Sequence, residues 1–99
     1  MFDCTGWIVQ ATAGRDKDDL FFVVGVDETK KRLLLANGKR RKAAAPKAKQ
    51  FGHVQPVDPE DFDHPVIHKL QKHEPVSDRE LRRSLAAFKG GNHAWLKTI

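Results

Sequence analysis

Short apolar segments separated by turn-forming residues fill the first 57 positions, and this pattern constrains the fold more than any other feature of the chain. Segment 6–13 is rich in β-branched and aromatic residues, segment 20–26 is apolar on both faces, and segment 32–36 carries three consecutive leucines. Runs of this length and composition are typical of β-strands. Short strands joined by tight turns fit a small barrel better than a parallel sheet.

Glycine and asparagine set the predicted bends and turns. Gly25 interrupts the second segment and predicts a bulge or sharp bend, which small barrels need at their corners. The dipeptide Asn37-Gly38 predicts a hairpin into a fourth strand, a weak edge strand over Lys39–Ala45. A last strand over Phe51–Val57 completes the set. The pattern therefore predicts a mainly β fold, a small five-stranded barrel.

The composition changes after Pro56. Residues 58–63 are acidic and contain proline, which is typical of a boundary, and beyond them apolar residues recur at helical spacing. We therefore divide the chain into a barrel over residues 1–57 and a C-terminal extension over residues 58–99. The extension comprises an acidic linker and a short α-helical part.

Two helices are predicted in the extension. Pro65–His73 starts with a proline, which is favoured at the first helical position. Ser77 and Glu80 form a capping box that starts the second helix, and two glycines end it. An apolar stripe at helical spacing follows the capping box and comprises Leu81, Leu85 and Phe88. Because a barrel of this size is only marginally stable alone, the stripe is expected to pack on it, with a partner helix as the alternative.

The charge is unevenly distributed along the chain. The net charge is +5, and residues 1–57 hold 11 basic and 6 acidic side chains whereas residues 58–99 hold 7 of each. Within the first part, Lys30–Gln50 carries nine lysines and arginines and no acid. A solvated surface usually mixes both signs, so a block of one sign favours a polyanionic partner over a merely solvated face or a membrane-surface patch.

The compartment is inferred from the cysteine content and the apolar runs. Cys4 is the only cysteine, so no internal disulfide can form, which favours a reducing compartment. Met1–Thr12 holds no basic residue and does not resemble a secretory signal, and no apolar run approaches membrane-spanning length. We expect a cytoplasmic, monomeric protein that does not bind membranes.

Catalytic and metal-binding signatures are weak. His64, His68 and His73 cluster in the sequence, but they lack the glutamate of a metalloprotease motif and the cysteines usual in a structural zinc site. The chain has no glycine-rich phosphate loop and no nucleophile elbow. We therefore predict no enzyme activity, no catalytic residues, no metal ligands and no cofactor.

A family resemblance spans residues 6–57. The strand with its loop Ala-Gly-Arg-Asp-Lys, followed by Leu20–Asp27, resembles a KOW motif. More closely, the segment is similar to KOW proteins related to archaeal and eukaryotic large-subunit ribosomal proteins, a group whose compact bacterial members occur as stand-alone RNA-binding proteins. The likeness continues through Leu33–Gly38 and the basic stretch to His53–Pro56. It implies an SH3-like barrel that binds RNA, most of all ribosomal RNA, in a ribosome-associated, assembly or translation role.

The resemblance places the RNA contacts in the loop after the first strand and in neighbouring basic segments. Gly14 is the position at which the family turns the chain, and Asp18 stands where many relatives have a second glycine. Aspartate tolerates left-handed backbone geometry, but Asp18 and Asp19 repel phosphate, so the stretch 39–49 is expected to make the main contact. The predicted RNA-binding residues are Gly14, Arg15, Lys17, Lys39, Arg40, Arg41, Lys42, Lys47, Lys49 and His53.

Two aromatic residues and one alternative function complete the expectations. Phe51 and His53 lie in the basic region and are candidates for base stacking, although Phe51, like Trp7, is rather expected in the core. The alternative function is a protein-binding adaptor of the transcription or translation machinery, which would use the barrel and the C-terminal stripe. DNA is compatible with the charge, and RNA is preferred on the resemblance alone.

Overall fold

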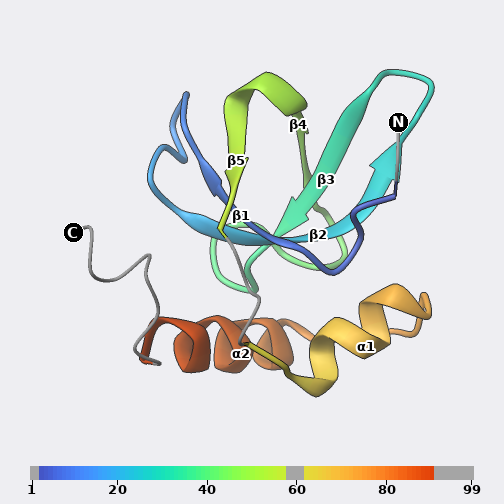
Figure 1. Ribbon diagram of the computed structural model, residues 1–99, viewed down its shortest axis with the longest axis vertical. Helices are drawn as coiled ribbons and strands as arrows, with labels where there is room; N and C mark the ends of the chain where they lie inside the picture. The colour runs from blue at the N-terminus through green and yellow to red at the C-terminus, as the bar shows by residue number, and fades with distance from the viewer. Residues whose placement is uncertain (1–2, 58–61, 91–99) are drawn as a thin grey trace.

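A five-stranded antiparallel sheet with two helices against one side forms the structure, a computed structural model that describes residues 3–57 and 62–90 (Figure 1). The strands are β1 (Ile8–Ala11), β2 (Leu20–Asp27), β3 (Arg32–Ala36), β4 (Lys47–Gln50) and β5 (Val54–Pro56). A 3₁₀ turn, η1 (Phe51–His53), precedes β5, and the helices are α1 (Pro65–Gln71) and α2 (Asp78–Gly90). The predicted mainly β fold with a helical C-terminal part is confirmed.

The sheet is curled because the chain joins its two edge strands directly. The strand order is β4-β3-β2-β1-β5, so β4 and β5 are the edges, and only η1 connects them. In a flat sheet these edges would lie about 19 Å apart, at roughly 4.8 Å per strand. The four residue steps from Gln50 to Val54 span at most about 14 Å. The edges therefore bend toward each other, as Figure 1 shows, but β4 and β5 do not pair within the described residues.

Alternating side chains of β2 enter two separate hydrophobic clusters. Phe21 and Val23 point into the curl, where they pack with Leu33 and Leu35 of β3. The side chains between them, among them Phe22, point to the opposite face, toward the helices. A strand buried on both faces explains the continuous apolar run. The predicted bulge is confirmed, since the β2–β3 register shifts between Val23 and Gly25.

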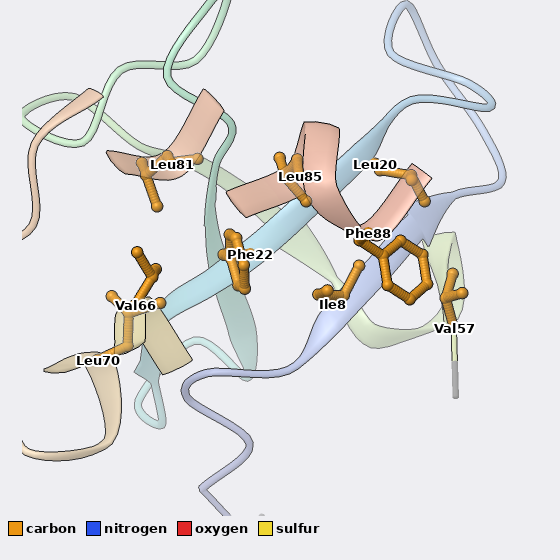
Figure 2. Packing of buried hydrophobic residues seen from close by; sticks show 10 residues of the cluster. Ile8, Leu20, Phe22, Val57, Val66, Leu70, Leu81, Leu85 and Phe88 are labelled. Atoms are coloured by element: carbon orange, nitrogen blue, oxygen red, sulfur yellow. The ribbon is translucent and has the colours of Figure 1, made fainter. Parts of the chain in front are cut away.

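The apolar stripe of α2 packs on the chain's own sheet. Leu81, Leu85 and Phe88 are at most 5% exposed and share a cluster with Ile8 and Phe22 (Figure 2). The stripe is therefore covered in this fold and is not an exposed docking face.

Side chains cap the starts of both helices. At the start of α2, the Glu80 amide donates to Ser77 Oγ and the Ser77 amide donates to Glu80 Oε2, both at 3.1 Å. At the start of α1, the Val66 amide donates to the His64 ring, 3.3 Å away. The predicted capping box is confirmed, and His64 serves as the cap of α1.

Two strand predictions were wrong in their positions. Lys39–Ala45 forms no strand, because Asn37 Oδ1 accepts hydrogen bonds from the Lys39 and Arg41 amides and turns the chain into a loop. The fourth strand therefore starts at Lys47. The fifth begins at Val54 because the preceding three residues form η1.

Two aromatic residues predicted in the core are partly exposed. Phe51 is 39% exposed in η1, and Trp7 is 37% exposed just before β1. Their predicted placement in the core was wrong, because Phe51 lies in η1 and Trp7 follows a turn, so neither lies on a buried strand face.

The predicted linker lies mostly outside the described residues. Of residues 58–63, the structure describes the last two. None of the described helices is long and apolar enough to cross a membrane.

Candidate nucleic-acid interface

A buried carboxylate joins the two loops that carry most of the predicted RNA-binding residues. Asp16 lies in the β1–β2 loop (residues 12–19) and is 1% exposed. Its Oδ2 accepts from Arg41 Nε at 3.1 Å and from Arg41 Nη2 at 2.8 Å, and Arg41 belongs to the β3–β4 loop (residues 37–46). Arg40 Nη1 lies 3.9 Å from Asp16 Oδ1, and its side chain is 55% exposed. Arg41 is therefore bound within the fold by two hydrogen bonds, whereas Arg40 makes only a long, mostly exposed ion pair.

Sequence reasoning missed Asp16. An acid between two basic residues of a loop is usually solvated, and nothing local marks this one as buried. Its partner lies 25 residues further along the chain. The one sequence signal was the adjacent pair Arg40 and Arg41, which could supply a partner for a buried acid. Pairing these arginines with Asp16, however, requires the three-dimensional fold, because the sheet brings the two loops to the same end.

The backbone of the β1–β2 loop adopts the predicted left-handed positions. Gly14 has φ of 81° and Asp18 has φ of 74°. The Asp18 amide donates to the Ala11 carbonyl at 2.8 Å, which closes the loop onto the end of β1. Aspartate thus occupies a position that favours glycine, as expected from its short polar side chain.

Lys49 and η1 attach to the same loop. Lys49 is 8% exposed, and its Nζ donates to the Ala13 carbonyl at 2.9 Å. The Thr12 amide donates to the His53 carbonyl at 2.8 Å. These contacts bring four segments together: the β1–β2 loop, the β3–β4 loop, β4 and η1. Lys49, like Arg41, therefore makes a side-chain hydrogen bond within the protein.

Helix α2 also holds the β3–β4 loop in place, through hydrogen bonds to its backbone. Arg82 Nη1 donates to the Gly38 carbonyl, and the Ala43 amide donates to Asp78 Oδ1, both at 2.7 Å. Gly38 has φ of 78°, and a Cβ there would lie 2.2 Å from the Asp78 carbonyl oxygen. Only glycine fits this close approach. No local sequence pattern indicates that α2 positions this loop, because the contacts join residues far apart in the chain.

The structure leaves an exposed set of basic side chains on the loops and on β4, which we call the loop surface. Its members are Arg15, Lys17, Lys39, Arg40, Lys42 and Lys47. Arg40 contacts Asp16 as above, and the described residues offer no ion-pair partner to the other five. Asp18 and Asp19 are exposed beside Lys17, so positive charge dominates on the β3–β4 side.

The histidines of the helical part do not converge. His68 Nε2 lies 2.7 Å from Asp63 Oδ1, His64 caps α1, and His73 follows α1 with φ of 59°. Across residues 3–57 and 62–90, no three histidine, cysteine or acidic side chains group as metal ligands would.

Cys4 and Glu80, which lie away from the loops, are among the groups with shifted pKa values. Burial raises the pKa of the Cys4 thiol. The hydrogen bond from Lys69, with a further one from the Ser77 amide, lowers the pKa of Glu80. Neither group contacts the loop surface.

Comparison with known proteins adds no functional assignment, since neither a model of a known protein family nor a curated protein matches this sequence.

Proposed function

We propose that this protein binds RNA through its loop surface and acts on or around the ribosome. The observation that carries the proposal is the joining of the β1–β2 loop to the basic β3–β4 loop by the buried Asp16. The exposed lysines and arginines of the two loops, with Lys47 at the start of β4, thus lie at one end of the sheet. The β3–β4 side of this surface holds like charges without an acid between them in the sequence, and so forgoes the mixing of signs that lowers repulsion on an ordinary surface.

The proposal includes an SH3-like barrel of the KOW type. The short connection between the edge strands supports it, because η1 makes the sheet curl around the cluster of Phe21, Val23, Leu33 and Leu35. A curled sheet of five short antiparallel strands around one core is close to a closed barrel. The Gly14 turn and the KOW-like order of motifs along residues 6–57 support it as well.

Binding would rest mainly on phosphate neutralisation. Each lysine or arginine that contacts a phosphate releases condensed counterions, and the bonds to the backbone carry no sequence information. Arg40 has an additional capacity: its guanidinium is mostly exposed and can turn from Asp16 to a phosphate or stack on a base. Phe51 and His53 are exposed in η1, next to the β1–β2 loop, and offer stacking faces.

Charge reversal at two places on the sheet tests the proposal. Lys42 and Lys47 are exposed members of the loop surface that make no ion pair within the described residues. Lys30 and Lys31 are exposed in the β2–β3 turn, at the opposite end of β2 and β3, and serve as the matched control. The affinity for a single-stranded RNA oligomer is measured by fluorescence anisotropy, with folding checked by circular dichroism.

The Lys42→Glu, Lys47→Glu variant should bind RNA at least about tenfold more weakly, since two attractions become two repulsions. The Lys30→Glu, Lys31→Glu variant carries the same change in net charge and should lose no more than about threefold through the long-range field. Equal losses in both variants, or none in the first, would overturn the loop surface as the binding site.

Sedimentation of cell lysate tests the ribosomal part. The protein should migrate with large subunits or polysomes at low salt and leave them at high salt. Migration only at the top of the gradient at low salt would remove the ribosomal placement and leave other RNAs as targets.

A further inference from the structure

A groove runs between α2 and the β3–β4 loop, next to the loop surface. Its volume is about 340 Å³, at the lower end of the range for ligand sites. One wall is formed by Lys39 and Arg40 of the loop, and the other by Arg82, Ala86 and Lys89 of α2.

The α2 wall follows from helical spacing. Arg82, Ala86 and Lys89 recur at intervals of four and three residues, so they share one face of the helix. That face adjoins the stripe that packs on the sheet, and Leu85 belongs to both. Leu85 is 5% exposed within the core cluster (Figure 2), and it also lines the groove. The groove thus has a polar rim and an apolar floor.

Positive charge dominates the rim. Lys39, Arg40, Arg82 and Lys89 line the groove, and Asp19 is the one acid among the lining residues that the structure describes. Arg82 is already anchored through Nη1 to the Gly38 carbonyl, which fixes the two walls relative to each other. Lys39 and Lys89 are exposed and have no ion pair within the described residues. Such a rim suits an anionic group above an apolar face.

We propose that this groove holds one unpaired nucleotide of the bound RNA, an inference that rests on the proposed function. Its phosphate lies among Lys39, Arg40 and Lys89, and its ribose and base lie against Leu85 and Ala86. Because Lys39 and Arg40 belong to both the groove and the loop surface, one RNA strand can contact the groove and the loop surface together. A paired base is held in its stack, so a narrow groove of this kind favours a single strand over a duplex.

Two neighbouring alanines of α2 provide a matched test. Ala86 and Ala87 are both exposed, but only Ala86 lines the groove. Ala86→Glu and Ala87→Glu add the same charge on the same helix, and each new carboxylate stands four residues after an arginine, Arg82 or Arg83. The affinities for a single-stranded RNA 12-mer and for a duplex of the same sequence are measured by fluorescence anisotropy on the full chain.

Ala86→Glu should weaken single-strand binding about fivefold or more, because a carboxylate then faces the phosphate at close range. The same substitution should weaken duplex binding less. The affinity of Ala87→Glu for each of the two RNAs should stay within about twofold of that of the parent protein. A second matched pair, Lys89→Glu against the exposed Arg83→Glu, should give the same ranking without changing the groove floor.

The outcomes separate the two proposals. Equal effects of the two members of each pair, with normal RNA binding by the parent protein, overturn the groove and leave the loop surface standing. An equal loss for single strand and duplex overturns the unpaired nucleotide. Absence of RNA binding by the parent protein overturns both the proposed function and the groove.

Discussion

From the contacts with Asp16 we predict that Arg41, and not the adjacent Arg40, stabilises the fold. Replacing Arg41 by alanine removes two hydrogen bonds to Asp16 Oδ2 and leaves a carboxylate that is 1% exposed without its main partner. Replacing Arg40 removes only a contact of 3.9 Å made by a side chain that is 55% exposed. The two substitutions delete the same kind of side chain from adjacent positions, and they differ in the strength of the contact with Asp16 that is lost.

The expected magnitudes follow from burial. Removing one partner of a buried ion pair costs about 3–5 kcal/mol. The Arg41 side chain is 25% exposed, and Arg40 stands close enough to replace it in part. These two facts reduce the expected cost of Arg41→Ala to about 2–3 kcal/mol. Arg40→Ala should cost less than about 1 kcal/mol, as is usual for an exposed pair.

Urea denaturation followed by circular dichroism measures both values. Arg41→Ala should also lower the Tm by roughly 10 °C or more, because 1 kcal/mol corresponds to about 4–8 °C in a domain of this size. The double variant Asp16→Ala, Arg41→Ala should be more stable than Arg41→Ala, since it leaves no buried charge. Equal costs for Arg40→Ala and Arg41→Ala would refute the assignment of Arg41 to the fold and of Arg40 to binding.

Three further predictions concern other parts of the structure. Gly38→Ala should cost more than about 2 kcal/mol, through its left-handed backbone and the clash with α2, whereas Gly52→Ala, whose added Cβ meets nothing within 4 Å, should be neutral in the same denaturation assay. The Cys4 thiol should stay unreactive toward a thiol reagent in the native protein and react after unfolding, because it is 1% exposed and burial raises its pKa. Glu80→Gln should reduce the free energy of unfolding at neutral pH. Because folding lowers the pKa of Glu80, this loss of stability should shrink and disappear as the pH falls below the group's ordinary value of 4.5. A loss that does not change with pH would count against the contact with Lys69.

Much of the fold could be predicted from local patterns. The double-sided apolar run of β2, the bulge at Gly25 and the Ser77/Glu80 capping box each depend on residues close in sequence, and all three are present. The packing of the α2 stripe followed from the need of a small sheet for more buried surface. The position of β4 could not be predicted in this way. The Asn37 side chain accepts hydrogen bonds from the Lys39 and Arg41 amides, so the chain forms a loop there and the strand starts later.

The candidate site was harder to predict, because its organisation depends on contacts between distant segments. The basic residues themselves are visible in the sequence, but their division into exposed and internally bonded groups is not. Lys49 reaches the Ala13 carbonyl 36 residues away, and Arg41 reaches Asp16 25 residues away. The attachment of Gly38 to Arg82 spans 44 residues. Only the sheet register, which brings these segments to one end, determines such pairs.

The salt dependence of RNA binding tests the central claim most directly. The affinity for a single-stranded oligomer is measured while salt is raised fourfold, from about 50 to about 200 mM. If about five of the exposed lysines and arginines contact phosphates, the plot of log affinity against log salt should have a slope of about −3.5, which is a loss on the order of 10²-fold. A slope near zero, or no binding at the lowest salt, would contradict the account.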